Sequence, residues 1–282
     1  MTPASRAIAG TGVLALAIGL SPQVGRAHDP DFVLGGVGTA VVDGVLSPGE
    51  WDRAGTRTFD VALPPNDGGG TTPVTLLIMN DATNLYVAFR VSRPVFGGGT
   101  NVSIHFDADH DRDREPGDDG FGMAVGEFSP PTLVDVFHDG LNDLRDDEFG
   151  GTNDGTTAAT TDGTFTYVEM SHPLDNTDDA HDFSLGAGDF VGFGGFVHLF
   201  SLDALCNEGG PPCSALTSFA GGFQDPVGDL LILSSAPGSC HHDAAEARRR
   251  FVDACVAAGA SPGSCNRTGT EIMLALVASC SP

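Results

Sequence analysis

Seven carboxylates crowd into a stretch of thirteen residues, at a spacing suited to binding a cation. They are Asp107, Asp109, Asp111, Asp113, Glu115, Asp118 and Asp119, and only Arg112 and Arg114 offset their charge. Calcium would relieve their mutual repulsion, because it takes about six to eight oxygen ligands and suits carboxylates two residues apart. We therefore expect a calcium site formed by Asp107, Asp109, Asp111, Asp113, Asp118 and Asp119. A solvated acidic turn is the alternative.

The spacing of this loop matches an EF-hand only in part. Four aspartates occupy positions one, three, five and twelve of that motif, but Arg112 stands where it has Gly. The twelfth position, Asp118, is Asp instead of Glu, and the flanking residues are typical of strands. The sequence therefore excludes an EF-hand and predicts a calcium loop between two strands.

The remaining acidic and histidine residues form no recognisable catalytic or metal motif. Two acidic clusters, at 143–148 and 175–182, are expected to be solvated loops. The chain has no HEXXH motif, nucleophile elbow, P-loop or complete dinucleotide-binding glycine motif. A carboxylate pair for glycoside hydrolysis depends on spatial separation and stays open. We expect a protein that is not an enzyme, with a hydrolase as an alternative.

The overall charge argues against nucleic acid as a partner. The chain has 38 acidic and 13 basic residues, all of the latter Arg, and a net charge of −25. Binding phosphates needs a basic patch, and the sequence offers only the run Arg248, Arg249 and Arg250. A self-repelling, very soluble particle is expected.

The first residues have the layout of a secretory signal peptide. Arg6 precedes an apolar run over 7–20 and a small-residue stretch that ends at Ala27. No later segment has the roughly twenty consecutive apolar residues that a membrane span needs. We expect a signal peptide over residues 1–27 and a secreted or periplasmic protein without a membrane span in the mature chain.

Short alternating apolar runs predict an all-β fold over residues 28–236. Apolar residues alternate at 74–78, 85–91 and 102–106, so that Ser103, His105 and Asp107 take the opposite face of their strand. The run at 190–202 is apolar on both faces and predicts a central strand. Frequent turn residues favour a two-sheet antiparallel sandwich, either immunoglobulin-like or jelly-roll.

Residues 237–282 predict a small disulfide-linked helical hairpin. A first helix is expected over 243–259, ended by Gly259, and a capping-box pattern at Thr268 and Glu271 predicts the start of a second. The hairpin either caps the sandwich or docks to a partner through Arg248, Arg249 and Arg250.

The six cysteines all lie in the last third of the chain, and their even number in an exported protein indicates disulfides. Four of them are symmetric about residue 260, and an antiparallel hairpin brings such positions together. We predict the pairs Cys240–Cys280, Cys255–Cys265 and, closing a loop, Cys206–Cys213. Sequence alone allows other pairings.

Several segments resemble family 9 carbohydrate-binding modules and the wider DOMON-like group. The segments are Asp43-Gly44-Val45-Leu46 with Glu50-Trp51, 84–91, 102–107 and, with its Pro-Leu ending, 169–174. The resemblance covers about residues 38–203 and implies a β-sandwich, often with structural calcium. The family holds sugars between tryptophans, but Trp51 is the only Trp here and is expected to be structural.

Another branch of the group is similar to heme-binding domains that use Met with Lys or His as axial ligands. Lys is absent here, but Met79, Met123 or Met170 could face a His, or could fill the core instead. We predict a secreted, non-catalytic binding or structural module, stabilised by calcium, that recognises a glycan or a cell-envelope surface. A heme-carrying electron-transfer domain is the alternative.

Overall fold

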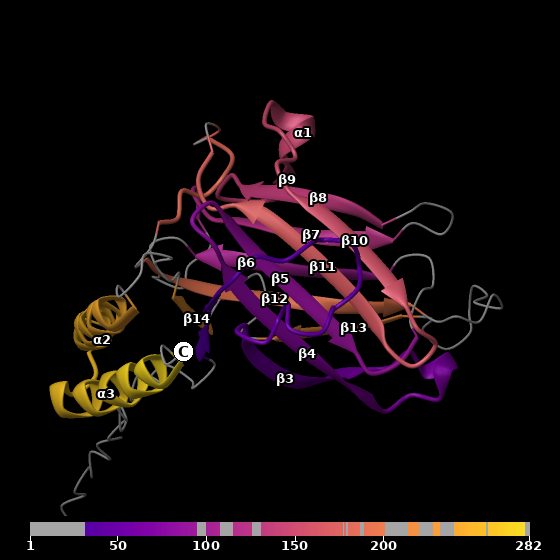
Figure 1. Ribbon diagram of the computed structural model, residues 1–282. Helices are drawn as coiled ribbons and strands as arrows, with labels where there is room; N and C mark the ends of the chain where they lie inside the picture. Colours follow the sequence, from indigo (N-terminus) through magenta and orange to yellow (C-terminus); the bar gives the residue numbers. More distant parts are fainter. Residues whose placement is uncertain are drawn as a thin grey trace, which may run out of the picture.

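The computed structural model describes residues 32–94, 100–107, 115–125, 131–176, 178, 180–186, 189–200, 214–219, 228–231, 240–257 and 259–279. Two β-sheets pack face to face, and a pair of helices lies beside them (Figure 1). The all-β sandwich with a C-terminal helical hairpin is therefore confirmed. The expected signal peptide, residues 1–27, lies outside the described residues.

The larger sheet has eight strands in the order β1-β14-β12-β6-β7-β8-β9, with β13 also paired to β12. The strands are β1 (Phe32–Leu34), β6 (Asn101–Asp107), β7 (Asp119–Val125), β8 (Pro131–His138), β9 (Asp143–Arg145), β12 (Phe190–Phe200), β13 (Ser214–Phe219) and β14 (Gly228–Leu231). β12 pairs with β6 on one side and with β14 and β13 on the other. Its central position confirms the prediction for the described part of 190–202.

The smaller sheet has six strands in the order β10-β11-β5-β4-β2, with β3 paired to β4. The strands are β2 (Gly36–Val37), β3 (Gly55–Ala62), β4 (Thr71–Asn80), β5 (Asn84–Val91), β10 (Thr156–Thr161) and β11 (Thr166–Pro173). A short 3-10 helix, η1 (Pro65–Asp67), follows β3, and α1 (Asp146–Phe149) follows β9. The chain changes sheet between β1 and β2.

The main core lies between the sheets and uses the alternating residues that the sequence marks. Val74, Leu76 and Ile78 of β4 are fully buried, and Phe89, Phe193 and Phe219 fill the space between the layers. A buried side chain of this size stabilises a fold by about 1.5–3 kcal/mol. Met123 and Met170 also belong to this core.

A second, smaller core covers the opposite face of the six-stranded sheet. Trp51 is 6% exposed and packs with Met79 and Tyr86. Its Nε1 donates to Glu169 Oε1 at 2.8 Å, which ties the covering segment to β11. The structural role expected for Trp51 is confirmed.

The helical hairpin consists of α2 (Cys240–Ala257) and α3 (Pro262–Ser279). Gly259 ends the first helix in the left-handed conformation, with φ of 86°. Cys255 and Cys265 form a disulfide with their Cα atoms 5.7 Å apart, which confirms that pair. The pairs Cys240–Cys280 and Cys206–Cys213 involve side chains outside the described part of the chain.

The predicted start of the second helix at Thr268 is wrong, because α3 begins at Pro262. Ser261 caps it by accepting a hydrogen bond from the Ser264 amide at 3.2 Å. Proline is favoured at the first helical position, where no amide hydrogen is needed. Among the described residues, no helix has the length and apolar character needed to cross a bilayer.

Candidate functional site

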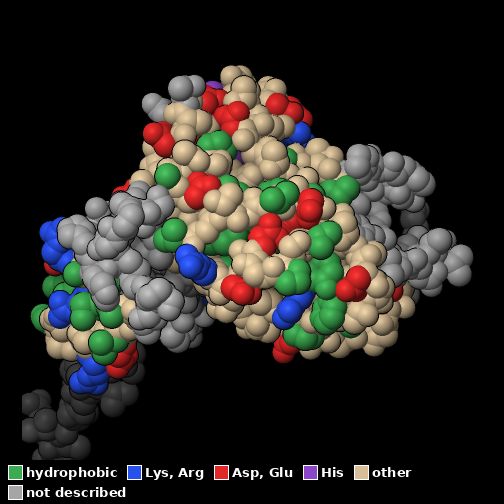
Figure 2. Space-filling model, in the orientation of Figure 1, with side chains coloured by type: hydrophobic (Ala, Val, Ile, Leu, Met, Phe, Trp, Pro, Cys, Tyr) green, Lys and Arg blue, Asp and Glu red, His purple; other side chains and the backbone are tan. Residues whose placement is uncertain are grey.

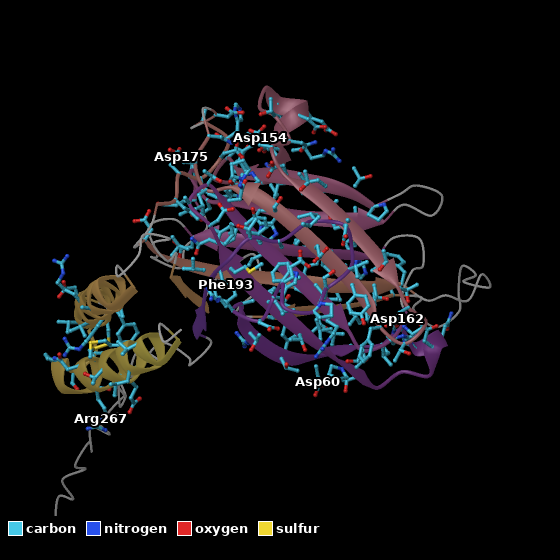
Figure 3. All side chains as sticks on the ribbon, in the orientation of Figure 1. Asp60, Asp154, Asp162, Asp175, Phe193 and Arg267 are labelled. Carbon is cyan, nitrogen blue, oxygen red and sulfur yellow. A yellow bond between two sulfur atoms is a disulfide. The ribbon has the colours of Figure 1, made fainter. Side chains whose placement is uncertain are left out.

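A group of ionisable side chains is buried between the two sheets, at the end of the sandwich next to α1. The larger sheet contributes Asp119 and Asp135, α1 contributes Asp146, β11 contributes His172, and the segment after β11 contributes Asp182; each is at most 8% exposed. Figure 3 labels Asp154 and Asp175 at this end, and Asp162 at the opposite end of β10 and β11. Buried charge is costly unless it is paired, so the group needs compensation. We call these five residues the interior acidic group.

Strand alternation explains why these polar residues face inward. Asp135 follows the core residue Leu133 by two positions on β8, and His172 follows Met170 by two on β11. The ring of Phe121 stacks on the imidazole of His172, with centroids 5.2 Å apart. The ionisable atoms are therefore enclosed by aromatic walls and shielded from water.

His172 is the centre of this group. Its Nδ1 lies 2.8 Å from the carbonyl oxygen of Pro173, which can only accept, so Nδ1 carries a hydrogen. Its Nε2 lies 3.2 Å from Asp135 Oδ2 and 3.2 Å from Asp182 Oδ1. Burial lowers the pKa of His172, but the hydrogen bonds with Asp135 and Asp182 outweigh it and raise that pKa to about 10.

Four carboxylates surround this single imidazole, and their hydrogen bonding is unequal. Asp119 accepts from the Phe183 amide at 2.9 Å and from the Gly120 amide. By contrast, Asp135 Oδ1 and both oxygens of Asp146 have no hydrogen-bond partner, and Asp182 Oδ1 has only the contact with His172 Nε2 at 3.2 Å. Burial and the neighbouring carboxylates Asp135 and Asp182 raise the pKa of Asp146 to about 8. Burial together with this crowding of carboxylates therefore disfavours a negative charge on Asp146 unless a cation balances it.

The geometry of three of these residues is that of a metal site. Asp135, His172 and Asp182 each offer a ligand atom, and these atoms lie within 4.8 Å of one another. Ligand atoms around one ion at about 2.0–2.6 Å fall within such a distance.

The residues predicted to bind calcium are distributed over more than one environment. Asp109, Asp111 and Asp113 lie outside the described residues. Asp107 ends β6 on the face opposite Phe106, whereas Asp119, paired with Phe106, points into the interior acidic group. Asp118 Oδ2 accepts from the Glu115 amide at 3.0 Å and closes a turn. The calcium loop at 107–119 stays a prediction.

Two residues of the interior acidic group come from the clusters expected to be solvated loops, and that expectation is wrong for them. Asp146 is 0% and Asp182 is 8% exposed. The expectation is right for Asp147 and Glu148, which are exposed beside Arg145. The sequence signal for this buried group is a polar residue at an inward-facing strand position. His172 is such a residue, because it follows the core residue Met170 by two positions on β11.

A pocket of about 350 Å³ lies on the outer face of the eight-stranded sheet. Phe196 of β12 and Val134 and Val136 of β8 give it apolar walls, and Ser103, His105 and Asp143 add polar groups. Ser103 Oγ and His105 Nε2 are hydrogen-bonded at 3.1 Å, and the His105 ring stacks near Phe196 with centroids 6.2 Å apart. We call this the outer-face pocket.

Glycine in β7 makes room for the outer-face pocket. A Cβ on Gly122 would lie 2.5 Å from the Val102 carbonyl oxygen and 2.8 Å from Ser103 Cβ. A Cβ on Gly120 would lie 2.5 Å from His105 Nδ1. A side chain at either position would displace the polar residues of β6, so glycine keeps them against β7 and leaves the space beside them hollow.

No family model matches the sequence, and no characterised protein matches it either. Two solved structures similar to this one are complexes of a family 9 carbohydrate-binding module from Caldicellulosiruptor kristjanssonii. The complex with cellotriose has a TM-score of 0.49 and 14% identity, covering 74% of this chain and 96% of the module. The complex with glucose has a TM-score of 0.49 and 15% identity, covering 73% and 98%. This is the family that the sequence segments resemble.

Proposed function

We propose that the chain is a non-catalytic binding module that holds a sugar unit of a glycan in the outer-face pocket. The observation that carries this is the combination of Phe196 with Ser103 and His105 in one concave space. A pyranose has an apolar face and a rim of hydroxyls, so it needs an apolar ring next to hydrogen-bonding groups. The pocket volume of about 350 Å³ suits a ligand of one or two sugar rings.

The residue that stacks on the sugar in this proposal is Phe196. Trp51 is unavailable, because it is buried against the six-stranded sheet and bonded to Glu169. A single aromatic ring predicts weak binding, with a dissociation constant on the order of 0.1–1 mM, or about 4–5.5 kcal/mol.

The charge of the pocket supports binding more than hydrolysis. Among the described residues that line it, Asp143 is the one carboxylate. Glycoside hydrolysis generally uses a pair of carboxyl groups about 5–10 Å apart. The disulfide between Cys255 and Cys265 supports the further proposal that the protein works outside the cytoplasm, where such bonds persist.

Glycan-array binding followed by calorimetry tests this function. Phe196→Ala should weaken binding of the best glycan at least about tenfold, which corresponds to about 1.4 kcal/mol. Leu216→Ala is the control, since Leu216 lies on the neighbouring strand β13, is 54% exposed and does not line the pocket. Absence of any glycan ligand, or equal affinity of the Phe196 variant, would contradict the proposal.

The same preparation tests the heme alternative. His105 lines the outer-face pocket, whereas Met123 and Met170 are buried in the main core between the sheets. A Soret band in the visible spectrum of the purified protein would assign the pocket to heme instead of sugar.

A further inference from the structure

The interior acidic group has the donor atoms of a metal site. Asp135 Oδ2 and Asp182 Oδ1 each lie 3.2 Å from His172 Nε2, and the three residues come from β8, the segment after β11, and β11 itself. Each of the three is at most 8% exposed. These donors do not belong to the outer-face pocket or to the loop at 107–113.

The orientation of His172 fits a ligand. Its Nδ1–H donates to the Pro173 carbonyl oxygen at 2.8 Å, which leaves Nε2 to face the two carboxylates. Histidines that bind metals usually donate their other ring N–H to a carbonyl or carboxylate in this way. Two charge states satisfy the geometry: an imidazolium that donates to Asp135, or a neutral imidazole whose Nε2 lone pair faces a cation.

Asp146 decides between these two states. It is fully buried, and neither of its carboxylate oxygens has a hydrogen-bond partner. Asp135 Oδ1 likewise has no hydrogen-bond partner. An imidazolium would donate to one of these residues and leave the oxygens of Asp146 unsatisfied, at a cost that native proteins avoid. A cation among the carboxylates would satisfy them together.

We propose that Asp135, His172 and Asp182, with Asp146 as a fourth ligand bound directly or through water, hold one divalent cation inside the sandwich. The donor set is rich in carboxylate oxygen and includes one imidazole, so a hard ion such as Ca²⁺ or Mn²⁺ fits better than a thiolate-preferring metal. The ion joins β8 and β11, which belong to different sheets, to α1 and to the segment that contains Asp182.

The supporting contacts show that the site is built into the fold. Asp135 Oδ2 also accepts from the Asp154 amide at 3.1 Å, and Asp182 Oδ2 accepts from Asn176 Nδ2 at 2.7 Å. Asp135 and Asp182 are therefore each oriented by a hydrogen bond from a neighbouring residue, which is typical of residues around a metal.

The test measures metal content and thermal unfolding of the full chain. After dialysis against Ca²⁺, Mn²⁺ or Zn²⁺ in separate samples, bound metal is determined by mass spectrometry, and melting is followed with and without EDTA. The wild type should retain a bound ion after dialysis against Ca²⁺ or Mn²⁺, and EDTA should lower its Tm. Retention of Zn²⁺ alone would overturn the assignment to a hard ion.

Asp146→Asn is the decisive variant, because the two charge states predict opposite results. If Asp146 is a ligand, the variant should bind about one ion fewer per chain and should have a lower Tm in metal-containing buffer. The decrease in Tm that EDTA causes by removing this ion should then be absent. If the group contains no metal, Asn replaces a buried carboxylate that has no partner, and the Tm stays the same or rises. The second result would overturn the proposal.

Two control variants locate the ion. Asp147→Asn changes the neighbouring exposed residue of α1, which pairs with Arg145, and should leave metal content unchanged. Asp109→Asn with Asp111→Asn should also leave this ion in place. Loss of the only retained ion in the loop variant would place it in the loop at 107–113 and contradict the interior site.

Discussion

Glu169 is a buried carboxylate that accepts hydrogen bonds from three donors in the segment covering the six-stranded sheet. The donors are Trp51 Nε1 at 2.8 Å, the Gly44 amide at 2.8 Å and the Asp43 amide at 3.1 Å. Burial raises the pKa of Glu169 despite these bonds, each of which favours the charged form. The opening segment and β11, which the sequence shows as separate pieces of a resemblance, thus meet at one side chain.

We expect Glu169→Gln to destabilise the protein by about 2–4 kcal/mol, because hydrogen bonds to a charged group are strong and a buried amide hydrogen would face other donors. Urea unfolding monitored by Trp51 fluorescence measures this. Glu148→Gln, whose side chain is 62% exposed, is the matched control and should change little. A loss below about 0.5 kcal/mol in the Glu169 variant would show that these bonds contribute little.

Asp162 gives a prediction for pH, because it closes the turn between β10 and β11. Hydrogen bonds from the Phe165 and Thr164 amides, and then from the Tyr167 hydroxyl, lower its pKa. A lowered folded-state pKa stabilises the fold above the unfolded-state pKa, and this contribution is lost as the pH falls through the folded-state value. The Tm difference between wild type and Asp162→Ala should therefore be larger at pH 7 than near pH 3. A difference that does not change with pH would contradict this assignment.

For single residues, the sequence predicts the types of the candidate ligand residues better than their positions in the fold. Among the described residues of the predicted calcium loop, Asp119 is the one that lies in the interior acidic group. His172 and Asp135 face inward because of strand register, and register depends on pairings between distant segments. Carboxylate density along the chain therefore marks the loop at 107–119 but cannot mark a group that forms only through strand pairing.

Among the elements, the helical hairpin offers the clearest match between pattern and structure. Cys255 and Cys265 stand five residues on either side of residue 260, and the disulfide joins them. Gly269 lies opposite Phe251 and Val252, and a Cβ there would come within 2.8 Å of Val252 Cγ2. Close approach of the two helices thus depends on this glycine as well as on the disulfide.

Replacing both Cys255 and Cys265 by Ser should destabilise the hairpin by about 3 kcal/mol, because a loop of about ten residues is no longer closed in the unfolded state. Hydrogen exchange of the amides in α2 and α3 measures this locally. The amides of β4 and β5, deep in the sandwich, are the internal control. Unchanged protection of both helices would show that packing alone holds the hairpin.

The sequence predicts where the strands lie along the chain, but not which strands pair with one another. Where one face of a strand is buried, as in β4 and β6, alternation marks it in the sequence. Pairing is different: β12 lies beside β6, which precedes it by more than eighty residues, and no local pattern contains that information. The predicted start of α3 is wrong because the sequence contains two capping signals. Ser261 and Pro262 form the observed start, and Thr268 and Glu271 lie inside the helix.

At the scale of the whole molecule, acidic side chains are more widespread than basic ones on the face of the sandwich seen in Figure 2. Figure 2 shows Asp and Glu spread over the face of the six-stranded sheet and around α1, with few Arg between them. This agrees with the net charge of −25 and with the absence of a basic patch large enough for nucleic acid in the sequence. An uncharged ligand such as a glycan avoids the repulsion that a polyanion would meet.

The pairing of β1 with β14 constrains the order in which the molecule can be completed. Phe32 lies opposite Asp229 in a parallel ladder, so the first described strand of the sandwich pairs with the last. A ribosome or an export channel delivers the N-terminal strand first, and this strand then waits, unpaired, for the other end of the domain. Folding dominated by such distant pairings is slow and exposes strand edges in the meantime. An exposed edge is prone to pair with other chains, so speed of delivery and protection by chaperones should limit the yield of this protein more than the stability of its finished fold.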